Sequence, residues 1–236
     1  VLFRSAFSFS LLDFSAATTA SFNTQYTQSL NPANVTALYK FSGTANQVVY
    51  LDNTAFTSTD IWYASSGTSD RWRLFDPNGA EVGRWLLNND SGRVTLPATG
   101  DYTLVLEGVN GASIDETTFV IRDASAADRV LPYATGSTVS GSILPGPMND
   151  YQFTLSAPAH LWFDSQASSA ARWSLLDSSG NPLTDTSGAT LTGRSFFAGD
   201  DHVGFVPAGN YTLRVTADIE PPSAAFNSST RDFAFD

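Results

Sequence analysis

The chain contains no cysteine, one lysine (Lys40), one methionine and only two histidines among its 236 residues. The absence of cysteine excludes disulfide bonds, thiolate nucleophiles and thiolate-bound zinc. Twelve basic residues against 23 acidic residues give a formal net charge of −11. Because phosphate binding requires a basic surface, this charge argues against a nucleic-acid partner. No apolar run approaches the roughly 18 residues that cross a bilayer, so we expect no membrane insertion.

The residues that are abundant favour strands and turns. The chain has 17 Phe, 8 Tyr and 5 Trp within a hydrophobic fraction of 42%, which is typical of a globular protein with a packed core. Ser and Thr together number 54; Thr and aromatic residues suit strands, and Ser suits turns. No segment of helical length shows a sustained 3.6-residue period. The composition therefore predicts an all-β protein.

The second half of the sequence repeats landmarks of the first half. These landmarks are a Tyr-x-Phe strand, a Trp-x-Leu-x-Asp-x-x-Gly segment and a Gly-x-Tyr-x-Leu strand. They lie at residues 39–41, 72–79 and 100–104 in the first half, and at residues 151–153, 173–180 and 209–213 in the second half. Turn formers and alternating apolar residues are repeated, and no catalytic constellation is repeated with them.

This repetition predicts two domains, which also suits the length of the chain. We expect an N-terminal segment at 1–19, a first module at 20–123, a linker at 124–134 and a second module at 135–236. Residues 1–5 resemble the translated read-through of a sequencing adaptor and do not enter the fold argument. Seven or eight short strands per module, separated by turns, indicate two tandem antiparallel β-sandwiches of jelly-roll-like type. The strand alternation predicts a core that contains Trp72, Leu74, Tyr102, Leu104, Trp173, Leu175, Tyr211 and Leu213.

The sequence offers little for catalysis. A serine hydrolase needs a histidine base, and only His160 and His202 are present, without a Gly-x-Ser-x-Gly elbow. Neither histidine has a counterpart in the first half. Glycoside hydrolysis needs two facing carboxylates, and none of the four glutamates occupies a repeated position. We therefore predict no catalytic residues and expect the chain not to be an enzyme.

Calcium is an open alternative because aspartates recur at aligned positions. Calcium takes six to eight oxygen ligands, which carboxylates, carbonyls and Asn side chains on loops supply. The candidate ligands are Asn89, Asp90, Asp200 and Asp201. The competing interpretation is structural: Asp76 and Asp177 open turns by accepting from the following backbone amides, and Asp52 and Asp164 end strands.

A carbohydrate-binding face is a further alternative. Sugars stack on exposed aromatic rings, and Trp62, Tyr63 and Trp85 occur only in the first half. The repeated Trp72 and Trp173 alternate in phase with leucines, which favours core packing for those two.

The order of the landmarks resembles the bacterial pre-peptidase C-terminal (PPC-like) domain. The pattern is a Pro-Gly turn before Tyr-x-Phe at 142–153, an Asp-ended strand, Trp-x-Leu-x-Asp-x-x-Gly, and Gly-x-Tyr-x-Leu. The Pro-Gly turn is intact at Pro145-Gly146 and reads Pro32-Ala33 in the first half. The resemblance covers most of both modules, and its motifs are turn and core signals.

The resemblance implies a jelly-roll-like sandwich that is extracellular or at the bacterial cell surface, non-catalytic and sometimes calcium-binding. Tandem copies favour a structural or adhesive pair in a large secreted or surface protein, with neighbouring modules, surface carbohydrate or protein as partners. The alternatives are a calcium-binding module and a carbohydrate- or peptide-binding accessory module appended to a secreted hydrolase.

Overall fold

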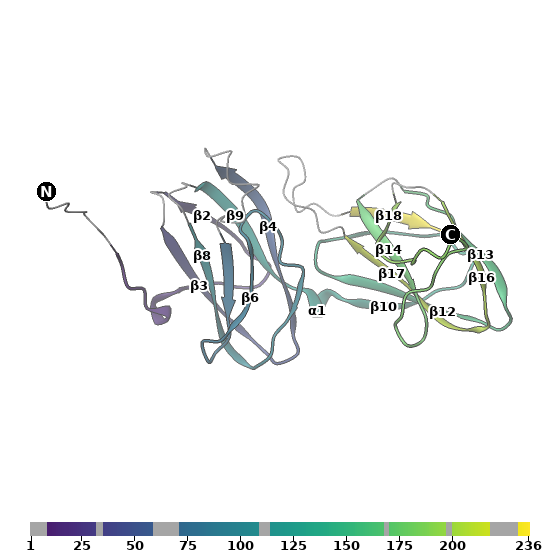
Figure 1. The fold of residues 1–236 in the computed structure, drawn as a ribbon, viewed down its shortest axis with the longest axis horizontal. Helices are drawn as coiled ribbons and strands as arrows, with labels where there is room; N and C mark the ends of the chain where they lie inside the picture. The colour runs from purple at the N-terminus through teal and green to yellow at the C-terminus, as the bar shows by residue number, and fades with distance from the viewer. Residues whose placement is uncertain are drawn as a thin grey trace, which may run out of the picture.

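A computed structural model describes residues 9–31, 35–58, 71–108, 114–167, 170–196, 200–217 and 231–236. Apart from the 3-10 turn Phe14–Ala16, Phe196 at the edge of another such turn, and the four-residue helix α1 (Ala124–Ala127), the regular structure of these residues is β (Figure 1). The prediction of an all-β chain with two tandem sandwiches is confirmed. Among the described residues, no helix has the length and apolar character needed to span a membrane.

Each module contributes nine strands to the described part of the chain. The first module contains β1 (Thr18–Thr19), β2 (Gln25–Leu30), β3 (Thr36–Gly43), β4 (Val48–Ser58), β5 (Arg71–Phe75), β6 (Glu81–Leu86), β7 (Arg93–Thr95), β8 (Gly100–Glu107) and β9 (Ile114–Asp123). The second contains β10 (Arg129–Pro132), β11 (Val139–Ile143), β12 (Met148–Leu155), β13 (Ala159–Phe163), β14 (Ala171–Leu176), β15 (Arg194–Ser195), β16 (Asp201–Val206), β17 (Gly209–Ala217) and β18 (Arg231–Phe235).

The strand order is that of a jelly roll, and both modules share it. In the first module, one sheet has the order β1-β3-β8-β5-β6 and the other has β2-β9-β4-β7. In the second, β10-β12-β17-β14-β15 reproduces the first of these sheets strand for strand. The other sheet is divided into the pairs β11-β18 and β13-β16, which one isolated bridge between Ser165 and Phe235 connects.

The repeated landmarks form the core of each sandwich. In β5, Trp72 and Leu74 are buried between outward-facing arginines, and Trp173 and Leu175 alternate in the same way in β14. All eight residues predicted for the core are at most 8% exposed. They belong to two separate clusters, one in each module. The alternation of the sequence predicts that these side chains are buried, and their burial stabilises the fold.

A tyrosine fastens the same turn in both modules. The Tyr102 hydroxyl donates to the Ala98 carbonyl at 2.7 Å, and the Tyr211 hydroxyl donates to the Pro207 carbonyl at 2.9 Å. Both rings lie in the core, so each hydroxyl needs a partner that replaces water. The Gly-x-Tyr-x-Leu repeat thus preserves a corner as well as a buried strand.

The turn aspartates behave as the structural interpretation expects. Asp76 accepts from the amides of Asn78 and Ala80, both at 2.8 Å. Asp177 makes the equivalent bonds to the second and fourth residues after it. A third turn of this type, which the sequence reading missed, starts at Asp185. Its signal is the same Asp-x-x-Gly pattern.

Three expectations need adjustment. The strand count is nine, because short β1 and β10 add in parallel to the edges of β3 and β12. These two strands lie within the expected N-terminal segment and linker. Asp52 does not end a strand: it lies within β4, and its side chain is buried because Arg122 on the adjacent β9 pairs with it.

Candidate functional site

A network of hydrogen bonds outside the cores joins the two modules. Arg93 on β7 makes a two-pronged contact with Asp128, at 2.9 and 2.6 Å, and also donates to the Gly146 carbonyl at 2.6 Å. Asp128 in turn accepts from the Met148 amide at 2.8 Å. One guanidinium therefore holds the entry to the second module and its Pro-Gly turn together.

The Pro-Gly turn of the second module packs on the outer face of the first. Pro145, Gly146 and Pro147 are all buried. Gly146 has φ +102°, and a Cβ atom built on it would lie 2.9 Å from Cβ of Tyr50 on β4. Both the backbone conformation and the close approach therefore require glycine here. We refer to Tyr50, Arg93, Asp128 and Gly146 as the joint.

Buried charges lie beside the joint on the same sheet. The ion pair between Asp52 and Arg122 is nearly enclosed, with side chains 2% and 12% exposed. Burial raises the pKa of Asp52, and the positive charge of Arg122 opposes that shift. Burial also raises the pKa of Asp90 to about 6 against the opposing hydrogen bond from Tyr50, and the nearby negative charge of Asp52 adds to the rise.

The aligned calcium candidates Asp90 and Asp200 share a structural contact. Asp90 accepts from the Asn53 amide at 2.8 Å, and Asp200 accepts from the amide of the aligned Ser165 at 3.0 Å. The second Asp90 oxygen accepts from the Tyr50 hydroxyl at 2.7 Å. Asp90 thus connects its loop to β4, and Asp200 connects its loop to the segment just after β13.

The other two calcium candidates do not join these aspartates in a cluster. The Asn89 carbonyl accepts from the indole of Trp72 at 3.1 Å. One carboxylate oxygen of Asp201 is buried and has no hydrogen-bond partner. Across the described ranges, no three acidic or histidine side chains gather as a metal site. Calcium binding stays a prediction that these contacts do not favour.

The two histidines lie on an exposed aromatic face of the second module. His160 and Phe205 form one cross-strand pair, with ring centroids 5.2 Å apart, and Trp162 and His202 form another at 5.5 Å. Trp162 and Phe205 are 59% and 63% exposed. Sequence reasoning missed this face because it took the histidines as isolated and did not consider Trp162.

The predicted carbohydrate residues give no such face in the described structure. Trp85 on β6 is half-buried, packs against the core of the first module and lies over Gly83. Trp62 and Tyr63 lie outside the described residues. Their role therefore stays a prediction.

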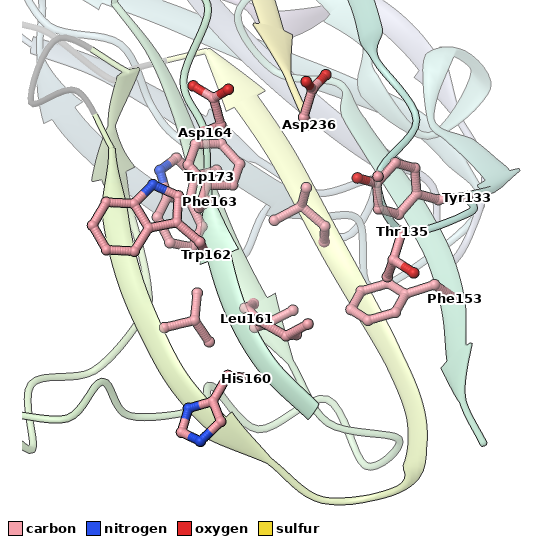
Figure 2. Close-up of a pocket in the computed structure, with 14 residues that line it drawn as sticks. Tyr133, Thr135, Phe153, His160, Leu161, Trp162, Phe163, Asp164, Trp173 and Asp236 are labelled. Atoms are coloured by element: carbon pink, nitrogen blue, oxygen red, sulfur yellow. The ribbon is translucent and has the colours of Figure 1, made fainter. Parts of the chain in front are cut away.

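The second module also contains a cavity of about 350 Å³ (Figure 2). Figure 2 shows Tyr133, Thr135 and Phe153 on one side of it and the β13 segment from His160 to Trp162 on the other. Its lining is mainly aromatic and aliphatic, and it reaches the core. The size is at the lower end for sites that hold small molecules.

No family model matches the sequence. Among curated proteins, none matches either. Solved structures that align include the CUB1-EGF-CUB2 domain of human MASP-1/3, at 7% identity, 90% coverage of this chain, 99% of that chain and a TM-score of 0.25. The same region of rat MASP-1 aligns at 7% identity over 92% of this chain and 98% of that chain, with a TM-score of 0.25. The extracellular region of zebrafish Gpr126/Adgrg6 aligns at 11% identity over 93% of this chain and 36% of that chain, with a TM-score of 0.24. Likenesses at these TM-scores carry no argument about function.

Proposed function

We propose that the chain is a non-catalytic pair of structural or adhesive modules within a larger extracellular bacterial protein. The observation that carries the proposal is the joint. A spacer must set the distance and angle between its modules, and here a buried turn of one module fits against a strand of the other. The extracellular and bacterial setting rests on the resemblance to PPC-like domains.

The joint supports this role because two independent contacts hold the same turn of the second module against the first. Tyr50 leaves no room for a side chain at position 146, so only glycine fits there. Arg93 contacts both the entry and the turn of the second module. Contacts of this type limit hinge motion between modules. Inter-domain motion is otherwise the default where the interface is small and polar.

A matched pair of glycine variants tests the role of the joint. Gly146→Ala introduces a Cβ atom against Tyr50, whereas Gly180→Ala carries a similar backbone penalty at φ +81° with no atom within 4 Å. We expect small-angle X-ray scattering to show a wider range of inter-module distances for Gly146→Ala and an unchanged profile for Gly180→Ala. Equal profiles for the two variants would remove the basis of the spacer role.

The absence of catalysis is a separate part of the proposal. Purified protein should not hydrolyse panels of peptides or glycosides above the buffer rate. Turnover that His202→Ala or Asp201→Asn abolishes would establish an enzyme and overturn this part.

A further inference from the structure

The cavity in the second module lies at the position that the last residues of β9 occupy in the first module, where they pair with β4. In the first module, β9 pairs with β4 from Asn53↔Phe119 through Leu51↔Ile121 to Val49↔Asp123. In the second module, the equivalent register starts at Ser165↔Phe235, and the Asp236 amide donates to the Asp164 carbonyl at 3.1 Å. Asp236 itself lines the cavity.

Both flanks of the cavity correspond to the flanks of Ile121. On one side is β13, in which Phe163 occupies the position that Leu51 has in β4. Within the described structure, the only strand that pairs with β13 is β16. On the other side is Gly136, at φ +81°, which aligns with Asn23 at φ +59° when the pairs Tyr26↔Phe119 and Val139↔Phe235 are superposed. The Asn23 amide donates to the Ile121 carbonyl at 2.8 Å.

The comparison also specifies the side chain that the cavity lacks. Ile121 is fully buried and belongs to the core cluster of the first module. The walls of the cavity include core residues of the second module, among them Phe163, Trp173 and Leu213. An apolar side chain at the equivalent position would remove this surface from water.

We propose that the cavity and the adjoining edge of β13 form a slot for one extended strand segment that lies in line with β18, in the register that Ile121–Asp123 holds in the first module. The first residue of this segment is apolar and fills the cavity as Ile121 fills the first module. Its backbone pairs antiparallel with Phe163, Trp162 and Leu161, which joins the two halves of the divided sheet. This mode of binding is strand addition, in which the backbone supplies hydrogen bonds and one side chain supplies selectivity. The inference does not depend on the spacer function.

Appending three residues to the chain tests the slot. Ile-Arg-Asp after Asp236 copies Ile121–Asp123, and Ser-Arg-Asp is the matched control of equal length and charge. We expect the isoleucine extension to raise the thermal midpoint of the second module by about 5 °C or more. The serine extension should give less than half of this rise.

Amide hydrogen exchange provides the second readout. Hydrogen-bonded pairs alternate along an antiparallel ladder, so the pair after Asp164–Asp236 falls on Trp162. We expect the Trp162 amide to exchange at least tenfold more slowly in the Ile-Arg-Asp chain than in the unextended chain. Equal midpoints for the two extensions, or unchanged exchange at Trp162, would overturn the proposal.

Discussion

The two modules share a strand order and differ in how their second sheet is closed. In the first, β9 lies between β2 and β4 along its length, and the sheet is continuous. In the second, β18 pairs fully with β11 and meets the segment just after β13 at the bridge between Ser165 and Phe235. The division coincides with a cavity and with the exposed face around Trp162. The landmarks repeated in sequence all lie in the sheet that the two modules share strand for strand.

The repeated tryptophans show the same contrast at a single side chain. The Trp72 indole donates to the Leu86 carbonyl at 2.8 Å and to the Asn89 carbonyl at 3.1 Å. The Trp173 indole nitrogen is buried and has no hydrogen-bond partner. The ring is therefore retained in both modules, whereas its polar contact is present in one.

Core truncation should give the largest effects. Trp72→Ala and Trp173→Ala should each lower the free energy of unfolding of their module by about 3 to 5 kcal/mol, because each removes a fully buried ring. Trp72→Phe and Trp173→Phe separate the ring from its polar contact. Only Trp72→Phe leaves carbonyls without their donor, which should cost roughly 1 to 3 kcal/mol more. Denaturant unfolding measures all four, and equal costs for the two phenylalanine variants would contradict the contrast.

Ion pairs in different settings should give the next largest difference. Arg122→Met removes the ion-pair partner of the buried Asp52, which should cost about 3 to 5 kcal/mol. Arg214→Met breaks the pair with Asp150, in which the arginine side chain is 34% exposed, and should cost about 1 kcal/mol or less. Denaturant unfolding of both variants tests the comparison. A larger cost for Arg214→Met would show that burial does not determine the ranking.

The pH dependence of stability should have opposite signs for two aspartates. The raised pKa of Asp90, about 6, means that the folded state holds a proton that the unfolded chain releases above its ordinary value of 3.8. Its contribution therefore grows as the pH falls from 7 to 4. Hydrogen bonds, chiefly from Ser187, lower the pKa of Asp185 to about 2, so its contribution is present above pH 4 and is lost toward pH 2.

Thermal unfolding of Asp90→Asn and Asp185→Asn against the unmodified chain, from pH 7 to pH 2, isolates each contribution. The stability difference for Asp90→Asn should change between pH 7 and 4, and that for Asp185→Asn between pH 4 and 2. A change in the same direction for both variants would contradict these assignments.

Calcium should have the smallest effect. Metal bound only to the folded state raises stability according to its concentration relative to Kd. Because protein donors bond to both oxygens of Asp90, we expect millimolar calcium to shift the thermal midpoint of the first module by less than about 1 °C relative to EDTA. A shift that Asp90→Asn or Asp200→Asn removes would establish the calcium site.

The sequence predicts local structure better than contacts between segments. The alternation around Trp72 and Trp173 and the Asp-x-x-Gly turns follow from nearest-neighbour physics, so burial and turn geometry could be anticipated. The pairing of Asp52 with Arg122 could not be, because the two residues meet only when β4 and β9 align. The joint could not be predicted either, because the need for glycine at position 146 comes from its contact with Tyr50 of the other module.

The most direct test of the account is whether the two modules keep one orientation in solution. Backbone residual dipolar couplings from the unmodified chain report the alignment of each module. The joint predicts that a single alignment tensor fits the couplings of both modules within experimental error. Two tensors that differ in orientation or magnitude would show independent motion and would contradict the spacer function.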